Sequence, residues 1–206
     1  MKKAGLFFMA VGALSLAACS TSTEVETDVE EVEAVTYTLD KESSSLGWAA
    51  QMSPEYGHTG TVEIKSGSIT MEGEELTGGS FVIDMTTIQS TDLPEEKAAV
   101  LKGHLQGTMV DEDHPQNMFF NTPEFPTVEV KLGNYEDGKL NITLMILGSE
   151  ISEVVPVDIS ADENGASIKG KFSVNFASLN MPGLAPSEHG AIQPDFEFDL
   201  NAVLTK

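Results

Sequence analysis

Residues 76–88, LTGGSFVIDMTTI, carry the pattern that decides the fold. Phe81, Ile83 and Met85 alternate along this stretch with Val82 and Asp84. Successive side chains of a β-strand point to opposite faces of a sheet, so the three large apolar residues share one face. The pattern therefore predicts a half-buried strand of an antiparallel sheet.

The same period of two recurs along the chain, with turn residues between the runs. These runs lie at 45–51, 60–73, 128–132, 139–148, 167–179 and 195–206. About eight alternating runs separated by turn signals predict an all-β domain, either a barrel or a sandwich. A closed antiparallel barrel of about eight strands is wide enough to hold one small ligand.

One stretch, TDLPEEKAAVLKGHL at 91–105, has helical spacing instead. A proline stands near its start, two acids follow in the first turn, and Ala98, Leu101 and Leu105 form one stripe. These are the signals of a helix start and of a helix with one apolar face. Gly103 costs about 1 kcal/mol inside a helix, so we expect the end of this helix to fray.

The composition limits the functions open to the chain. Its 206 residues include 33 acids and 11 bases, all of them lysines, for a formal net charge of -22. Such a charge repels phosphate backbones and anionic lipid, which argues against nucleic-acid binding and against electrostatic docking on a membrane. Cys19 is the single cysteine, so an internal disulfide is excluded and the core must supply the stability.

The first nineteen residues resemble the export signal of a bacterial lipoprotein. Two lysines precede an apolar run, 4–18, that is too short to span a bilayer comfortably. Leu16 stands where an ordinary cleavage site has a small residue, and LAAC at 16–19 resembles a lipobox. The resemblance implies cleavage before Cys19, acylation of that cysteine and stable anchoring by two or more chains. The alternative is a secreted protein without lipid.

The residue after the cysteine bears on localisation. In lipoproteins of this kind, a residue other than aspartate there implies export to the outer membrane, and this chain has Ser20. We therefore expect a protein of the cell envelope, lipid-anchored in the outer membrane and facing the periplasm.

Three segments are expected: a signal peptide at 1–18, a lipidated cysteine and acidic tether at 19–35, and one domain at 36–206. Residues 20–35 hold six acids and no base. Self-repulsion is expected to keep such a segment extended and disordered. The alternative, an edge strand through three valines of this segment, lacks a clean alternation.

The domain carries a recognisable order of motifs. These are YTLD at 37–40, a strand with Trp48, GTVEIKSGSI at 60–69, GGSFVIDMTTI at 78–88, LKGHL at 101–105 and FFNTPEFPTVEV at 119–130. This order resembles the YceI-like family of exported bacterial lipocalin-like proteins. The most specific part is the helix, then Phe119-Phe120, then Phe125-Pro126 opening a strand.

The resemblance carries expectations of fold and function. It implies an extended, eight-stranded antiparallel β-barrel, lipocalin-like, with one short helix near an end. It also implies an apolar channel for a long amphiphile such as a polyisoprenoid or a fatty amide. The family is not known for catalysis, so we expect no enzyme activity and no cofactor other than such a bound lipid.

The chain departs from the family pattern at several points. Lys102-Gly103 stand where many members carry an Arg-Asp pair, and an insertion, QGTMVDEDHPQN at 106–117, separates the helix from Phe119. The arginine typical of the region around 172–183 is missing. These departures affect contacts to a ligand head group, so no head-group residue is carried over from the family.

The apolar stripes have two interpretations. They either pack as a filled core or line a cavity, and periodicity alone does not distinguish the two. The family resemblance favours the cavity. The residues expected to line it or to close one end are apolar side chains of the strands, the helix and the segment after the helix: Trp48, Phe81, Ile83, Met85, Leu101, Leu105, Phe119, Phe120, Leu144, Ile146, Phe172, Val174, Phe176, Phe196 and Phe198.

Metal binding and hydrolysis find little support in the sequence. No two of the histidines, His58, His104, His114 and His189, stand at the spacing of a known metal motif. The sequence therefore predicts solvated loop histidines and no metal site. A G-x-S-x-G elbow is also missing.

The most favoured function is an envelope lipoprotein that binds an isoprenoid or other long-chain amphiphile in an apolar channel, for transport, storage or sensing. Its expected partners are a lipid-like small molecule and the membrane reached through acylated Cys19; no protein partner can be named. The alternative is a non-catalytic interaction module, with a filled barrel that docks another envelope protein.

Overall fold

The computed structural model describes residues 33–53, 55–112, 114–179, 181–186 and 191–206. In chain order their elements are β1 (Ala34–Leu39), β2 (Ser45–Ser53), β3 (Tyr56–Glu72), β4 (Glu75–Ser90), α1 (Glu95–Gln106), β5 (Thr127–Glu136), β6 (Lys139–Ile146), β7 (Ser149–Pro156), β8 (Asp158–Ala161), β9 (Ala166–Asn175), the 3-10 helix η1 (Pro182–Leu184) and β10 (Asp195–Thr205).

The N-terminal expectations lie mostly outside these residues. The signal peptide at 1–18, the lipidated Cys19 and the tether up to residue 32 are not described. The tether was expected to end at Val35, but Ala34 and Val35 already belong to β1, where they pair with Glu72 and Met71 of β3. The domain therefore begins two residues earlier than expected, because residues 34 and 35 form strand pairs with β3.

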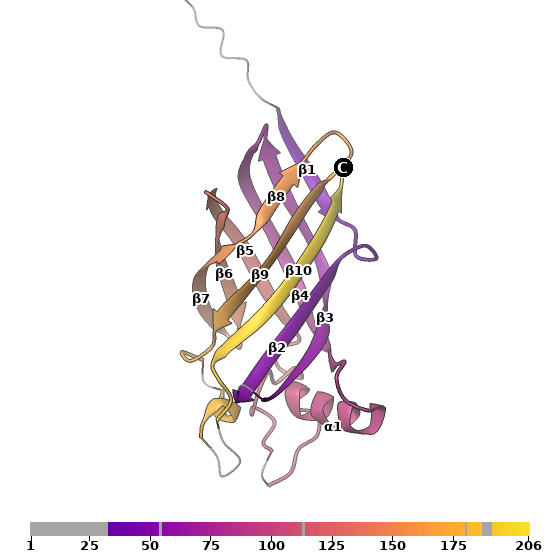
Figure 1. Cartoon of the computed structure of the whole chain (residues 1–206), viewed down its shortest axis with the longest axis vertical. Coiled ribbons are helices and arrows are strands. Elements are labelled where there is room, and N and C mark those ends of the chain that lie inside the picture. Colours follow the sequence, from indigo (N-terminus) through magenta and orange to yellow (C-terminus); the bar gives the residue numbers. More distant parts are fainter. Residues whose placement is uncertain (1–32, 54, 113, 180, 187–190) are drawn as a thin grey trace, which may run out of the picture. The chain divides into compact units, whose positions relative to one another are not determined.

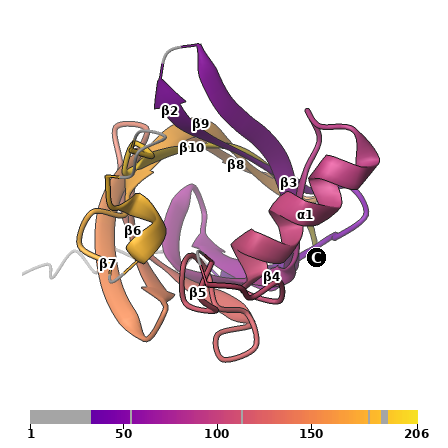
Figure 2. The ribbon, with the colours of Figure 1, turned by 90° about the horizontal axis from the view of Figure 1, so that it is seen from below.

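The described strands form one antiparallel sheet that curls into a barrel (Figures 1 and 2). Two positions in it are each shared by two consecutive strands. β1 and β2 both pair with β3 and with β10, one after the other along those strands. β7 pairs with β6, and β8 then pairs with β9. Ten strands thus occupy eight positions, which confirms the eight-stranded barrel and excludes the sandwich.

The chain changes partner between β7 and β8 at one residue, Val157. Pro156 is still in register with Lys139 of β6, whereas Asp158 is in register with Lys169 of β9. The Val157 N–H donates to the Gly138 carbonyl at 3.0 Å, so this backbone group stays satisfied at the break. The interrupted strand closes the barrel, because its first half, β7, pairs with β6 and its second half, β8, pairs with β9.

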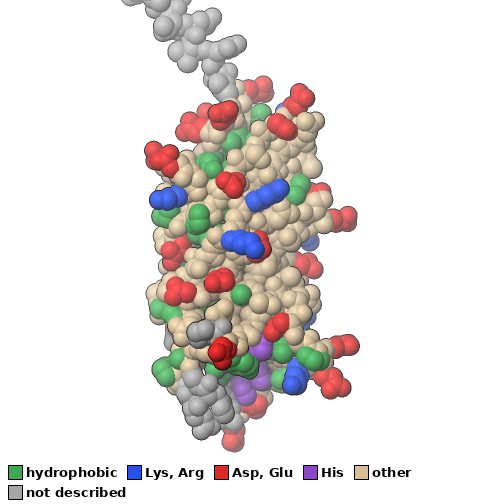
Figure 3. Space-filling model, viewed as in Figure 1, with side chains coloured by type: hydrophobic (Ala, Val, Ile, Leu, Met, Phe, Trp, Pro, Cys, Tyr) green, Lys and Arg blue, Asp and Glu red, His purple; other side chains and the backbone are tan. Residues whose placement is uncertain are grey.

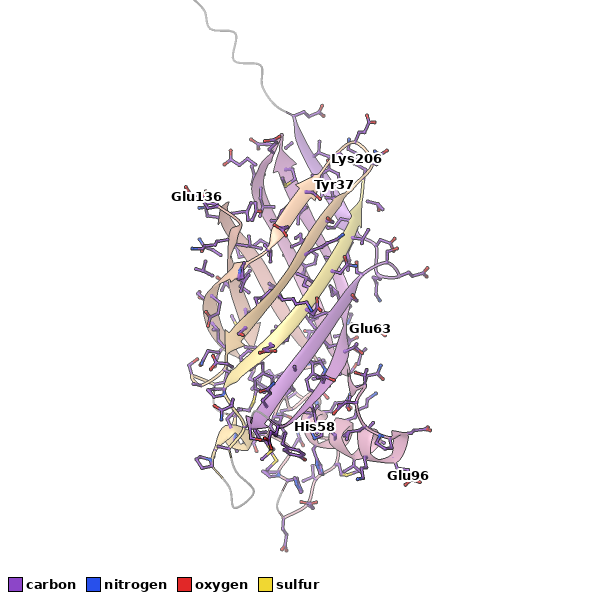
Figure 4. All side chains as sticks on the ribbon, viewed as in Figure 1. Tyr37, His58, Glu63, Glu96, Glu136 and Lys206 are labelled. Carbon is purple, nitrogen blue, oxygen red and sulfur yellow. The ribbon has the colours of Figure 1, made fainter. Side chains whose placement is uncertain are left out.

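The end of the barrel away from α1 is solidly packed. Tyr37, Ile69 and Leu204 are buried there, and Ile69 and Leu204 are 0% and 1% exposed. Figure 4 places Tyr37 and Lys206 at this end and His58 and Glu96 at the other. Side chains fill the barrel interior at the Tyr37 end, as in an ordinary core.

Helix α1 lies across the opposite end, together with η1 (Figure 2). The fraying expected at Gly103 is not found, since the helix continues to Gln106 and ends at Gly107, whose φ is 71°. The Gly107 N–H donates to the His104 carbonyl at 3.1 Å, a capping bond that stabilises the last turn. No helix in the described part of the chain is long and apolar enough to cross a membrane.

Candidate ligand-binding cavity

A cavity of about 130 Å³ lies inside the barrel. Every residue that lines it is apolar, and the lining includes residues of each strand from β2 to β10 except β8. It extends from Leu105 and Phe120 at the helix end to Val155 and Val157 near the break between β7 and β8. The alternating pattern thus places a continuous apolar surface inside the barrel and polar side chains outside it.

The structure places most of the predicted channel residues on this cavity. Thirteen of the fifteen line it: Trp48, Phe81, Ile83, Met85, Leu105, Phe120, Leu144, Ile146, Phe172, Val174, Phe176, Phe196 and Phe198. Their contact with a ligand stays a prediction.

Two predicted lining residues, Leu101 and Phe119, lie elsewhere. Leu101 faces a shallow outer groove with Val100 and His104, one helical turn before Leu105. The helix runs from Glu96, outside the outline of the barrel, toward the barrel opening, so only its last turn reaches the cavity (Figures 2 and 4). Phe119 is buried but packs against η1, and a Cβ on Gly183 would come within 2.4 Å of its ring.

The barrel is neither fully filled nor fully hollow. The packed end around Tyr37, Ile69 and Leu204 does not touch the cavity, which begins further toward α1. Phe172, Phe198 and other cavity-lining residues are only half-buried although they point inward. An inward side chain that is still accessible has empty space in front of it, so these residues face the void.

Aromatic rings form one wall of the cavity. The ring centroids of Phe176 and Phe196 are 5.0 Å apart, and those of Phe176 and Phe198 are 6.3 Å apart. Tilted and edge-on arrangements at these distances are favourable for aromatic pairs. On the opposite side, the ring of Phe81 lies directly over Gly67 of β3, because a Cβ on Gly67 would come within 2.0 Å of that ring.

A group of buried polar side chains supports the helix end, and the sequence analysis missed it. The Gln106 side-chain amide donates to the Thr86 carbonyl at 2.5 Å, and Thr122 donates through its hydroxyl to the Gln106 carbonyl at 3.1 Å. The Asn121 amide donates to Glu124 at 2.9 Å. The first two bonds fasten α1 to β4 and the following segment to α1, and the third closes a local turn. The Asn-x-x-Glu pattern at 121–124 is the one sequence signal that could have indicated such a turn.

Histidines gather at the helix end of the molecule (Figure 3). His58 Nδ1 lies 3.0 Å from a carboxylate oxygen of Asp92, so His58 is tied to a partner rather than simply solvated. Burial raises the pKa of Asp92, but hydrogen bonds from His58, Ser90 and Thr59 outweigh it and hold this pKa below its ordinary value. The interaction joins the beginning of β3 to the segment that leads into α1.

His104 and His114 also differ from the expectation. Their rings stack at 3.9 Å between centroids and 7° between planes, and His114 Nδ1 lies 2.8 Å from Asp111. Sequence spacing failed here because the inserted segment folds back onto α1. His189 lies outside the described residues.

The fold and the cavity define an antiparallel, lipocalin-like barrel with an apolar interior. The YceI-like domain model matches residues 37–204. This chain therefore belongs to the YceI-like family, as its motifs indicated. Comparison with curated proteins gave no match.

Solved structures share this fold at low sequence identity. A polyisoprenoid-binding domain from Saccharophagus degradans, implicated in plant cell wall breakdown, is 13% identical with a TM-score of 0.58, and the match covers 82% of this chain and 97% of that one. BcnA from Burkholderia cenocepacia is 14% identical with a TM-score of 0.62, over 81% of this chain and 99% of that one. At such identities the likeness establishes the fold.

Proposed function

We propose that this chain is an envelope lipoprotein whose barrel binds the tail of an isoprenoid or another long-chain amphiphile. The observation that carries the proposal is the wholly apolar cavity. An apolar tail gains about 25 cal/mol for each Å² removed from water, and each buried methylene contributes about 0.8 kcal/mol. Binding by burial needs no covalent chemistry.

Family membership and one structural neighbour support this ligand class. The Saccharophagus degradans domain, which shares the fold, is described as polyisoprenoid-binding. The cavity of this chain is suited to the same class of ligand, because its wall is a continuous apolar surface along the barrel and presents no polar side chain to a tail.

The cavity must widen to accept a long tail. Pockets that enclose whole small ligands usually measure about 300–1,000 Å³, whereas this one measures about 130 Å³. Phe172 and Phe198 are half-buried beside the void, and Met85 is flexible, so these side chains are placed to move aside. We expect the bound barrel to hold them in different rotamers.

The helix end is the proposed entrance. The opposite end is packed around Ile69 and Leu204, whereas at the helix end the cavity is lined by Leu105 and Phe120, which are adjacent in sequence to the buried polar residues Gln106 and Asn121. A tail entering there would leave its head group beside the polar side chains near Gln106 and Thr122. This arrangement follows the general design of lipid sites, an apolar interior with a few polar groups at its mouth.

We propose that acylated Cys19 holds the protein in the outer membrane, facing the periplasm. The lipobox-like stretch 16–19 supports anchoring, and Ser20 supports the choice of membrane. Labelling cells with a fatty-acid analogue should mark the wild-type protein and not a Cys19→Ser variant. An anchored barrel could store, carry or sense its amphiphile.

Native mass spectrometry tests ligand binding directly. A secreted form of residues 33–206 retains every described strand and helix of the barrel, and its mass should exceed the chain mass by that of a bound amphiphile that solvent extracts. A barrel that is empty and also refuses added polyprenols, quinones and fatty acids would contradict the proposal. That result would favour the alternative, an interaction module that docks another envelope protein.

A further inference from the structure

Three potential metal ligands meet at the helix end, outside the cavity. One ligand atom each from His104, Asp111 and His114 lies within 4.8 Å of the other two. His104 belongs to the last turn of α1, and the other two belong to the insertion at 106–117. Two separate parts of the chain therefore supply one set of donors, which no sequence motif connects.

Backbone bonds hold the insertion in this position. The Thr108 and Met109 N–H groups both donate to the Gly103 carbonyl, at 2.9 and 3.2 Å. Met109 packs so closely on the helix that a Cβ on Gly103 would lie 2.8 Å from it. Gly103 thus allows the chain to turn back over the last turn of α1, which brings Asp111 near His104.

A second turn then places His114. The His114 N–H donates to an Asp111 carboxylate oxygen at 2.8 Å, and the Asp111 N–H donates to the His114 carbonyl at 3.2 Å. This turn directs the His114 ring back onto His104, where the two rings stack. The three side chains are therefore assembled by the local fold and do not depend on chance proximity of mobile surface groups.

The donor set suits a divalent transition metal. Two imidazole nitrogens and one carboxylate oxygen are common ligands of Zn²⁺, at about 2.0–2.2 Å each. Ligand atoms on one tetrahedral ion lie roughly 3.3 Å apart at those distances, inside the 4.8 Å span that they occupy here. Because the two rings are parallel, one of them must turn about its side-chain bond to direct its nitrogen at the same ion.

We propose that His104, Asp111 and His114 bind one Zn²⁺ ion and that the ion fastens the insertion to the last turn of α1. His104 is adjacent to Leu105, which lines the cavity. The metal would therefore stabilise the cap over the barrel end. The inference does not depend on the identity of the ligand inside the barrel.

Metal titration tests the site. The purified full-length protein, stripped with a chelator, should bind one Zn²⁺ per chain by calorimetry, and Mg²⁺ at the same concentration should not replace it. His114→Ala and Asp111→Asn should each weaken Zn²⁺ binding by at least about tenfold, the loss that removing even an outer partner of a metal site causes. Asp111 is exposed, so its substitution is not expected to prevent folding.

A matched control distinguishes specific Zn²⁺ binding at this site from general attraction of the ion to the acidic surface. His58→Ala removes another histidine at the same end, which pairs with Asp92 and lies outside the cluster. It should leave Zn²⁺ affinity unchanged. No uptake by the wild type, or equal affinity in the wild type and His114→Ala, would overturn the proposed site.

Hydrogen exchange tests the fastening itself. Zn²⁺ should slow amide exchange in residues 107–112 of the wild type and leave the exchange of β9 and β10 unchanged. Binding of Zn²⁺ without slower exchange in the insertion would overturn the proposed role while retaining the site.

Discussion

Phe172 of β9 and Phe198 of β10 are register partners whose ring centroids lie 5.9 Å apart, tilted by 31°, on the wall of the cavity. Both rings are half-buried although they point into the barrel. The pair therefore marks a part of the cavity wall whose side-chain surface stays accessible to a ligand tail.

A charge in this pair should abolish ligand retention. Phe172→Asp would place a carboxylate in a cavity with no polar partner, and such burial costs several kcal/mol. Ser173→Asp adds the same charge one residue along β9, where the side chain is exposed. We expect co-purified amphiphile to be lost from the first variant and kept in the second, as measured by native mass spectrometry.

An uncharged variant controls for misfolding caused by the buried charge. Leu200→Trp adds bulk to the same wall and should reduce the bound amphiphile while the circular dichroism spectrum stays that of the wild type. Full retention of ligand by folded Phe172→Asp and Leu200→Trp would show that the tail lies elsewhere.

We expect the Phe81 ring to keep its position only when residue 67 has no side chain. A Cβ at Gly67 would meet the Phe81 ring at 2.0 Å, so Gly67→Ala must push the ring into the cavity. We expect a loss of about 1–3 kcal/mol in the free energy of unfolding, as for other overpacked cores, together with weaker ligand binding.

Gly78→Ala is the matched control for that change. Gly78 lies on the neighbouring strand β4, and an added Cβ there would have no atom within 4 Å. Urea unfolding should place this variant within about 0.5 kcal/mol of the wild type. Equal stability of the two alanine variants would mean that Phe81 does not rest on Gly67.

The strands and the cavity wall were the predictable part of the molecule. Phe81, Ile83 and Met85 all lie inside, because a period of two fixes the face of every residue in a half-buried strand. The same pattern could not distinguish the packed end near Ile69 from the hollow part, since both need the same inward apolar side chains. The difference depends on three-dimensional packing, which sequence periodicity does not report.

The helix end was the less predictable part. Leu101 and Leu105 share one helical stripe, yet only Leu105 reaches the cavity, because the tilt of α1 depends on where the barrel ends. His104 and His114 meet through a chain reversal that no spacing rule describes. Local patterns indicated the helix itself, whereas its placement and the fold of the insertion depend on contacts between distant segments.

Asp92 should make the stability of the folded barrel depend on pH in the acidic range. Its pKa is held below the ordinary 3.8, since the hydrogen bonds from His58, Ser90 and Thr59 outweigh the effect of burial. A lowered pKa means that the folded state binds fewer protons than the unfolded state near this pH. The stabilisation is therefore complete above about pH 4 and is lost as the pH falls through the folded-state pKa.

Asp92→Asn should remove that contribution. At pH 6 the variant is expected to be less stable than the wild type by up to about 1 kcal/mol, the size usual for partly exposed pairs. The difference should narrow toward pH 3, where the wild-type carboxyl is protonated as well. Thermal unfolding between pH 3 and pH 6 measures this, with Asp158→Asn, an exposed carboxyl on β8, as control. A stability difference that does not change with pH would contradict the assignment.

Two isoleucines should distinguish the packed end of the barrel from the hollow part. Ile69 is 0% exposed and lies away from the cavity, whereas Ile88 is 3% exposed and lines it. Replacing either with alanine should cost about 2–5 kcal/mol, because both lose buried contacts. Only Ile88→Ala enlarges the existing cavity near its helix end, so only this variant should bind a bulkier apolar tail more tightly. A series of polyprenols of increasing length, titrated into both variants, measures the difference. Tighter binding by Ile69→Ala instead would place the ligand at the opposite end of the barrel and would contradict entry beside α1.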